Sequence, residues 1–167
     1  HDSAENVRLH LCADRTYQEK LVRFIENHDE PRALAAFSSQ KERAAAVVIA
    51  TIPGAKLFHE GQFEGRKVKL PVFIARRPDE LPDPDLPGFY RTLLEAASSE
   101  GLRGGHWQLC KCTGWPDNAR FQNLLAWCWH RAGEHHLIVV NLSDGNAQGQ
   151  VRLPWDEIRG KSWQMTD

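Results

Sequence analysis

Short hydrophobic runs alternate with polar stretches in the first half of the chain, and polar residues follow each run. Residues 21–25 and 55–59 are short and mostly apolar, which predicts two strands. The Ala-rich segment between them carries larger apolar residues at helical spacing: Ala44, Val47, Val48 and Ile52. Pro53-Gly54 ends this predicted helix. Strand, helix and strand in this order predict a βα unit with parallel strands and a right-handed crossover.

The flanking segments complete the first half. A capping box, Ser39-Gln40-Lys41-Glu42, predicts where the main helix begins, and residues 32–37 predict a helical turn before it. Residues 17–20 are expected to form a short helical or turn-like approach. Residues 65–87 predict a surface connection, with three prolines between positions 76 and 85. A second amphipathic helix is expected from Phe89 to Ala97, ending near Gly101.

The pattern changes after Gly104-Gly105, where short strands alternate with turn residues. The expected strands are residues 106–112, 124–130, 136–142 and 150–153, and residues 163–167 resemble a strand that stops early. The apolar run Ile138-Val139-Val140 is typical of a central strand. The predicted fold is therefore α/β over residues 1–103, followed by an antiparallel all-β domain over residues 104–167 that is incomplete at its end.

Composition narrows the function classes. The chain has 167 residues, a formal net charge of -1 and a pI of about 6.8. Nucleic acids and anionic membranes favour basic faces, so neither is an expected partner. No run of about 18 apolar residues predicts a membrane-spanning helix. The first residue is His1 rather than Met, from which we expect a piece of a longer protein.

The four cysteines favour structural thiols in a reducing, cytoplasmic setting. Cys110-Lys111-Cys112 lacks the spacing of a zinc knuckle, and residues two apart in a strand share a face. A metal site, or a disulfide with Cys128, stays open as the less favoured interpretation.

A dense cluster of polar residues follows the first predicted strand. Residues 26–32 contain three carboxylates, an imidazole, an amide and a guanidinium, with Pro31 near the end. Ligands of α/β proteins bind outside the carboxyl ends of the strands. The cluster is therefore the candidate site.

This cluster carries a family resemblance. Phe24-Ile25-Glu26-Asn27-His28-Asp29 resembles the Asn-His-Asp signature of the alpha-amylase superfamily, glycoside hydrolase family thirteen, which ends the seventh strand of a (β/α)8 barrel. Residues 54–62 are similar to the eighth strand, and residues 138–143 resemble the central strand of the β domain that follows the barrel. The resemblance implies the last βα units of a TIM-type barrel plus most of that β domain. Phe63 departs from it, because a Glu often follows Gly-Gln there.

The resemblance also implies a chemistry, retaining hydrolysis or transfer on α-glucans such as maltooligosaccharides. Asp29 would stabilise the transition state through sugar hydroxyls, His28 would donate a hydrogen bond to the same sugar, and Asn27 would orient its neighbours. Arg32 either reaches a neighbouring subsite or, as we favour, pairs with Glu26 or Glu30. An ordinary helix cap is the alternative interpretation of Asp29.

The other two catalytic groups of the family, the nucleophile and the acid/base, lie on the fourth and fifth strands of its barrel. These strands would precede His1, so the chain alone is expected to be inactive. No cofactor is expected, since the sequence has no phosphate loop, no Gly-x-Ser-x-Gly elbow and no His-Glu-x-x-His motif.

Two other function classes stay open. A non-catalytic sugar- or protein-binding module would present a face of tryptophans, although most of these fit a core better: Trp107, Trp115, Trp127 and Trp129. A metal module would use His135, His136 and the cysteines. Two strands of a barrel also leave exposed edges and apolar surface. The chain is therefore expected to self-associate through them, by pairing with another copy or swapping elements, or to lean on its own β domain.

Overall fold

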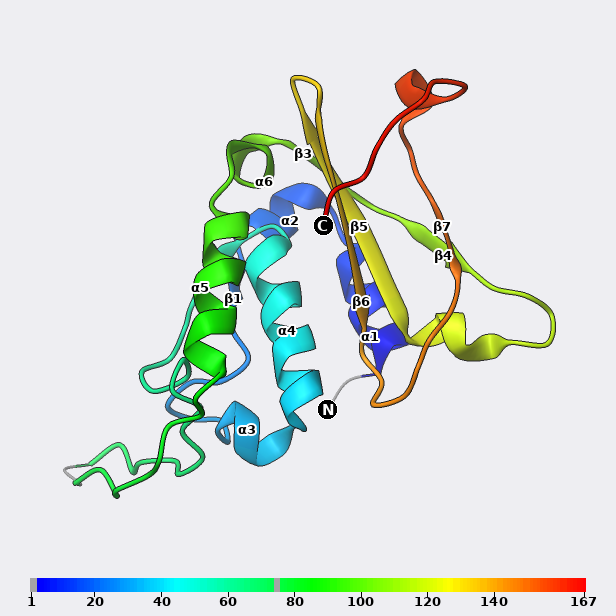
Figure 1. Cartoon of the computed structure of the whole chain (residues 1–167). Helices are drawn as coiled ribbons and strands as arrows, with labels where there is room; N and C mark the ends of the chain where they lie inside the picture. The colour runs from blue at the N-terminus through cyan, green and yellow to red at the C-terminus, as the bar shows by residue number, and fades with distance from the viewer. Residues whose placement is uncertain (1–2, 74–75) are drawn as a thin grey trace.

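The computed structural model describes residues 3–73 and 76–167. The first part of the chain is mostly helical (Figure 1), with these elements: α1 (Ala4–Leu11), α2 (Arg15–Glu19), β1 (Val22–Arg23), α3 (Ala33–Ala36), α4 (Ser39–Thr51), β2 (Ala55–Lys56), α5 (Leu86–Ala97) and α6 (Glu100–Gly104). The second part is mostly strand: β3 (His106–Leu109), β4 (Lys111–Thr113), η1 (Ala119–Asn123), β5 (Leu124–Arg131), β6 (Glu134–Asn141), β7 (Gln150–Arg152) and η2 (Asp156–Ile158).

The predicted βα unit is present. β1 and β2 pair in parallel, with Val22 opposite Ala55 and Arg23 opposite Lys56, and α3 and α4 connect them. Each strand is only two residues long, shorter than the five-residue runs that predicted them. Both strands direct their carboxyl ends toward the same side of the molecule, because a parallel pair shares one direction.

Helix α4 begins one residue earlier than the sequence predicts. The Ser38 hydroxyl accepts a hydrogen bond from the Lys41 amide at 3.3 Å, so Ser38 is the N-cap and the predicted capping box from Ser39 to Glu42 is wrong. Two adjacent serines can both serve as caps, and local sequence does not separate them. A long-range contact distinguishes them, because the Ser38 hydroxyl also donates to Asp144 Oδ1 at 2.6 Å.

Helix α1 was not predicted, and it joins the two parts of the chain. Ser3 caps it by accepting from the Asn6 amide at 3.2 Å. Arg8 donates to the Gln122 and Leu124 carbonyls at 3.0 and 2.9 Å, which fixes α1 against the start of β5. The short approach expected at residues 17–20 is found as α2.

The main antiparallel sheet has the order β3-β5-β6, so β5 is central among the described strands. The prediction that residues 138–140 form a central strand is wrong, since β6 lies at the edge and Val139 is 46% exposed. β5 instead is buried on both faces from Leu124 to Trp129. Apolar residues thus coincide with burial in β5 but not throughout β6, because β6 lies at the edge of the sheet and part of it stays exposed.

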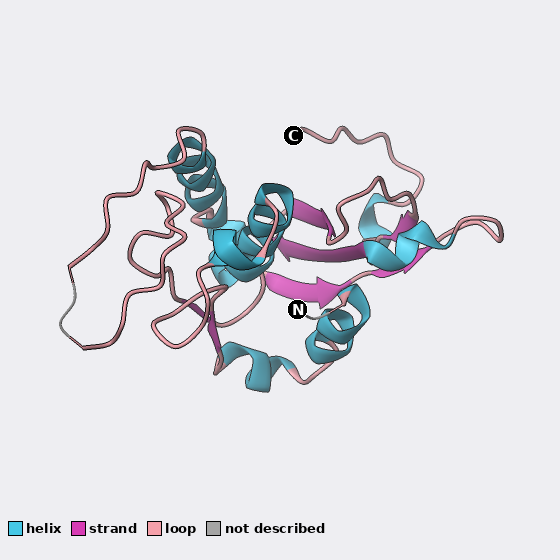
Figure 2. Cartoon of the chain, turned by 90° about the horizontal axis from the view of Figure 1, so that it is seen from below, coloured by secondary structure: helices cyan, strands magenta, loops and turns pink. Residues whose placement is uncertain are grey.

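Helix α4 lies between α5 and this sheet (Figure 1). One face of β5 packs against α1 and α4 through Leu125, Trp127 and Trp129. The opposite face, with Ala126 and Cys128, packs against a smaller cluster around Trp155. The connection between β2 and α5 extends away from the helices as a long loop (Figure 2), as predicted for residues 65–85. Its predicted end at residue 87 is wrong, because α5 begins at Leu86 rather than at Phe89.

Three details differ from or refine the predicted β domain. The strand expected over residues 106–112 is broken at Cys110, so that β3 belongs to the main sheet and β4 pairs with β7. Residues 163–167 form no strand. All four cysteines are free, and Cys110 and Cys112 pack into the same apolar cluster, in agreement with structural thiols on one face.

No helix among the described residues has the length and apolar character needed to cross a bilayer.

The four tryptophans of the proposed binding face differ in their burial. Trp107, Trp127 and Trp129 are buried, which confirms the core interpretation for these three, whereas Trp115 is 41% exposed. A binding face built from four tryptophans is therefore not present.

Truncating Trp127 should destabilise the protein far more than truncating Trp115. We expect Trp127→Ala to lower the free energy of unfolding by about 3–5 kcal/mol, because it empties a fully buried site. Trp115→Ala, the matched control, should change it by less than about 0.5 kcal/mol. Urea denaturation followed by circular dichroism measures both. Equal losses for the two variants would contradict this assignment of the core.

Candidate functional site

The segment after β1 is shaped by Asn27. Its side-chain oxygen accepts hydrogen bonds from the Asp29 and Glu30 amides at 2.8 and 2.9 Å. This Asx turn reverses the chain directly after the strand and fixes the direction in which His28 and Asp29 leave the backbone. Asn27 thus stabilises the backbone turn that carries His28 and Asp29.

His28 and Asp29 form an exposed pair. His28 Nε2 lies 3.2 Å from Asp29 Oδ2, and the two side chains are 67% and 73% exposed. The carboxylate caps no helix: the first free amide of α3, that of Ala33, is bound by Glu26 at 2.5 Å. The helix-cap interpretation of Asp29 is therefore wrong, and its carboxylate remains accessible to a ligand.

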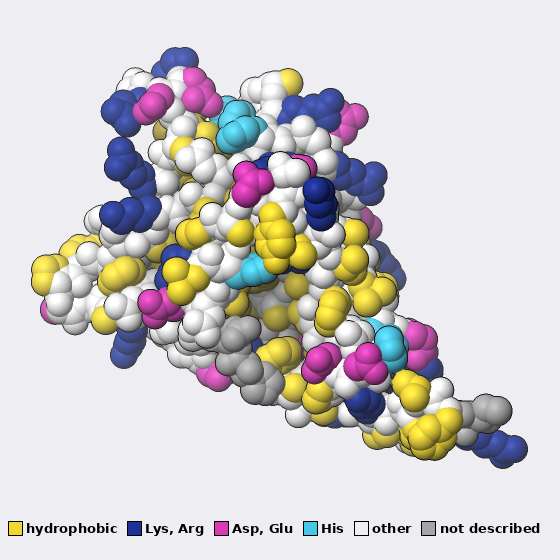
Figure 3. Space-filling model, turned by 180° about the vertical axis from the view of Figure 1, so that it is seen from behind, with side chains coloured by type: hydrophobic (Ala, Val, Ile, Leu, Met, Phe, Trp, Pro, Cys, Tyr) yellow, Lys and Arg dark blue, Asp and Glu magenta, His cyan; other side chains and the backbone are white. Residues whose placement is uncertain are grey.

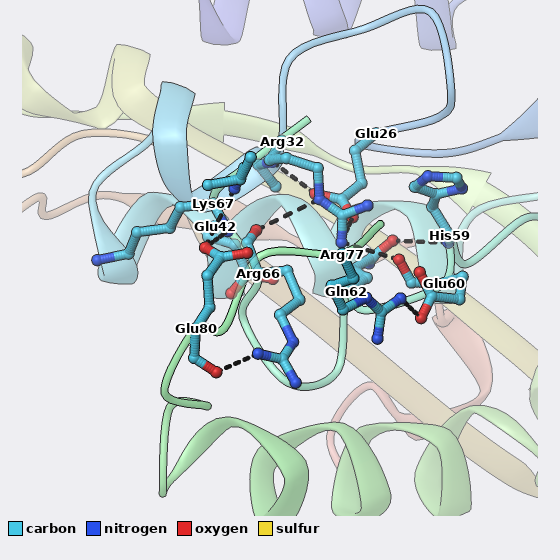
Figure 4. A network of polar contacts seen from close by, with 12 residues as sticks. Glu26, Arg32, Glu42, His59, Glu60, Gln62, Arg66, Lys67, Arg77 and Glu80 are labelled. Atoms are coloured by element: carbon cyan, nitrogen blue, oxygen red, sulfur yellow. Dashed lines mark hydrogen bonds and ion pairs between the residues drawn. The ribbon is translucent and has the colours of Figure 1, made fainter. Parts of the chain in front are cut away.

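Arg32 and Glu26 form the favoured ion pair, deep in the protein. Arg32 Nη2 lies 3.0 Å from Glu26 Oε1, with side chains only 5% and 1% exposed. Arg32 also donates to the carbonyls of Glu60 and Arg66 at 2.9 and 3.3 Å, both in the segment after β2. In Figure 4, Arg32 and Glu26 point toward each other. The ion pair thus joins the two segments that follow the parallel strands.

These segments enclose a pocket of about 160 Å³ at the carboxyl ends of β1 and β2. Three stretches of chain form its walls: Asn27, His28 and Arg32 after β1; His59 and Glu60 after β2; and Lys69, Leu70, Pro71 and Val72 from the long loop. Asp29 is not part of the wall, and its carboxylate reaches the site through its contact with His28. The structure therefore brings Asn27, His28 and Arg32 together and leaves Asp29 at the rim.

A buried chain of hydrogen bonds supports the second wall. The His59 amide donates to Gln62 Oε1 at 3.1 Å, Gln62 Nε2 donates to the Tyr90 hydroxyl at 2.7 Å, and that hydroxyl donates to Glu42. Gln62, Tyr90 and Glu42 are almost completely buried. Figure 4 draws Glu42 and Gln62 in one network of polar contacts with His59 and Glu60. Residues of α4 and α5 thereby hold the turn that lines the pocket.

Burial shifts the protonation of three groups near the site. It raises the pKa of Glu42, while the hydrogen bond from Tyr90 acts in the opposite direction. It also raises the pKa of Glu26, against the Ala33 amide and the Arg32 guanidinium. The pKa of His59 is lowered by burial and by the nearby Arg32 and His28. A neutral His59 offers one donor and one acceptor, a combination that matches a sugar hydroxyl.

Phe63, where the family pattern has a Glu, takes an apolar role. Its ring lies 4.6 Å from that of Tyr90 and 5.4 Å from that of Phe58, centroid to centroid. It packs against the same tyrosine that receives the Gln62 hydrogen bond.

Sequence reasoning missed the supporting residues Glu42, Gln62 and Tyr90, and the pocket residues His59 and Lys69. A signal for Glu42 was present: it shares the spacing of the buried α4 residues Ala46, Ile49 and Ala50. A carboxylate in register with an apolar stripe indicates a buried polar partner. Nothing local marks Tyr90 or Lys69, because long-range folding brings them to the site.

The histidines proposed for a metal are engaged elsewhere. His135 Nε2 lies 2.8 Å from Glu157, and His136 Nε2 lies 3.7 Å from Glu134. Within the described ranges, no group of three or more His, Cys, Asp or Glu residues could hold a metal ion. The metal module therefore has no support in the geometry.

The fold is similar to part of two solved alpha-amylase-type enzymes, which agrees with the resemblance at the level of fold alone. One solved structure that matches is a noncanonic maltogenic alpha-amylase from Thermotoga neapolitana, with a TM-score of 0.60 and 22% identity over 72% of this chain. Another is a debranching enzyme from Nostoc punctiforme, soaked with acarbose, with a TM-score of 0.62 and 19% identity over 83% of this chain. The chain spans 28% of each of these proteins. No family model and no curated protein matches the sequence.

The raised pKa of Glu42 makes stability depend on pH. A carboxyl whose pKa is higher in the folded state stabilises the protein below its unfolded pKa of about 4.5, and this contribution is lost as the pH rises through the folded pKa. Glu42→Gln keeps an acceptor for Tyr90 and removes the ionisable group. We expect the variant to gain stability relative to the wild type as the pH rises above about 4.5.

Urea denaturation at a series of pH values measures this difference. Glu95→Gln, an exposed change on α5, is the control and should leave the wild-type profile unchanged. If both variants follow the wild type in parallel, the buried carboxyl does not control the profile.

Proposed function

We propose that this chain is part of an alpha-amylase-type glycoside hydrolase or glucanotransferase that acts on α-glucans. In this proposal, residues 1–103 complete the (β/α)8 barrel, and residues 104–167 form most of the β domain after it. The observation that carries the proposal is the pocket at the carboxyl ends of two parallel strands, where His28 and Asn27 meet His59 and Glu60. Ligand sites of α/β barrels lie at this end of the strands.

The residues around the pocket have separate roles in the proposal. Asp29 stabilises the positive charge of the transition state and binds sugar hydroxyls with its exposed carboxylate. His28 binds a hydroxyl of the same sugar, and Asn27 holds both in place through the Asx turn. Arg32 lines the pocket, but its charge is committed to Glu26, so it shapes the site more than it binds substrate.

The chain binds but does not turn over its substrate in this proposal. Retaining hydrolysis needs two carboxyl groups about 5–5.5 Å apart, one as nucleophile and one as acid/base. Glu26 is buried and committed to Arg32 and the Ala33 amide, and Glu60 pairs with Arg77. Neither has the freedom that these roles require, so the remaining catalytic groups belong to other parts of the parent protein.

The neighbours in fold support the substrate class. One is described as a maltogenic alpha-amylase, and the other is a debranching enzyme soaked with acarbose. Hydroxyl-binding groups such as imidazole, amide and carboxylate around a small pocket fit a sugar ring.

Sugar binding tests the proposal directly. We expect maltohexaose to shift the NMR signals of the segments after β1 and β2 and to be released without cleavage. Asp29→Asn and His28→Ala should each weaken binding at least about tenfold, because the first removes the negative charge from a hydrogen bond to the sugar and the second removes the imidazole that binds a hydroxyl. Asp117→Asn, an exposed change in the β domain, is the control. Absence of binding by the wild type, or clear hydrolysis of maltooligosaccharides by this chain, would contradict the proposal.

An apolar groove of about 500 Å³ opens between α1 and β1. Val22 and Phe24 lie along it and are 56% and 40% exposed, and Figure 3 shows this hollow with hydrophobic side chains around it. β1 pairs only with β2 among the described strands, so its other edge has no strand partner there. Exposed edges and apolar faces promote association.

Self-association of the isolated chain is therefore expected through this groove. Light scattering should show a species larger than a monomer, and Val22→Lys should shift it toward the monomer, because a charge on an edge strand opposes pairing. Val139→Lys, at the exposed edge of the other sheet, is the matched control. A monomeric wild type whose β1 amides are all protected from exchange would rule out an open edge.

A further inference from the structure

The long loop between β2 and α5 forms part of the pocket wall and is held there by polar contacts, although the sequence predicts only a solvated connection. Lys69 donates to the backbone carbonyl of Asp29, and Arg77 pairs with Glu60. Glu80 closes the base of the loop by accepting from the Lys67 and Val68 amides at 2.9 and 3.2 Å. The loop thus contacts both segments that form the rest of the site.

The pocket is too small for more than a short part of an α-glucan. Its volume is about 160 Å³, whereas pockets that enclose drug-sized ligands measure about 300–1,000 Å³. A glucan chain with one sugar ring in the pocket must continue across the rim. The surface on which it continues decides how much a longer chain gains in affinity.

The rim offers two different surfaces. On the side of the first segment it carries the exposed charges of Asp29 and Glu30. On the loop side, Val72 lines the pocket and is 75% exposed, and the adjacent Phe73 is 74% exposed. Two large apolar side chains this exposed, continuous with a pocket wall, indicate a contact surface.

The pyranose ring of a glucan has an apolar face of C–H groups, which packs on an aromatic ring as other apolar groups do. We propose that Lys69–Phe73 forms a second sugar subsite, in which Lys69 holds the loop against Asp29 and Phe73 supports the next ring of the glucan. This inference rests on the proposed function and adds to it the residues that favour longer chains.

Two probes separate the subsites: methyl α-glucopyranoside, which has one ring, and maltohexaose, which has several. Phe73→Ala should weaken maltohexaose binding about 2- to 10-fold and leave the affinity for the single-ring probe unchanged. Phe73→Tyr should restore maltohexaose binding, because it keeps the ring. Leu81→Ala is the control: it removes a still more exposed apolar side chain of the same loop, which is not adjacent in sequence to a pocket-lining residue.

NMR titration measures both affinities, and circular dichroism confirms that each variant is folded. If the wild type binds neither probe, the proposed function fails and this inference fails with it. If the wild type binds both and Phe73→Ala binds both equally well, only the second subsite is overturned. A Phe73→Ala variant that changes the association state by light scattering, with sugar binding intact, assigns Phe73 to a protein contact and also overturns it.

Discussion

The candidate site depends on the buried ion pair between Glu26 and Arg32. Each end of the pair has further partners: Glu26 binds the Ala33 amide, and Arg32 binds the Glu60 and Arg66 carbonyls. The two strands themselves are short and share few hydrogen bonds, so they cannot fix the segments beyond them. A buried pair with further partners at both ends holds one geometry, because any displacement leaves a charge without a partner in a medium of low dielectric constant.

A second buried network fixes the segment after β2 from the side of α4 and α5. Glu42, Tyr90 and Gln62 belong to α4, α5 and the turn after β2, and they are linked in a single chain of hydrogen bonds. One oxygen of Glu42 has no hydrogen-bond partner among the described residues, which adds to the tendency of this carboxyl to stay protonated. This second network therefore supports the site through groups that do not line the pocket.

The sequence reveals the residues proposed to bind the ligand more readily than those that position them. Asn27, His28 and Asp29 stand together in a recognisable motif, and hydrophobic periodicity is sufficient to predict α4, the parallel pair and the β-rich second half. Three failures have a common cause. Ser38 rather than Ser39 caps α4, β5 rather than β6 is central, and Glu42 is buried, each because of contacts between segments far apart in the chain. Local pattern carries no information about such contacts.

The hydrophobic core connects the β-rich second half of the chain to the helices that support the candidate site. The predicted boundary lies near residue 104, yet a single apolar cluster includes Leu11 and Val48 from one side and Trp127 and Trp129 from the other. The Trp129 indole donates to the Thr51 carbonyl at 2.7 Å, at the end of α4. The same helix holds Glu42 near its beginning, so the β sheet constrains the element that supports the pocket. A β domain that packs in this way contributes to the geometry of the site without contacting it.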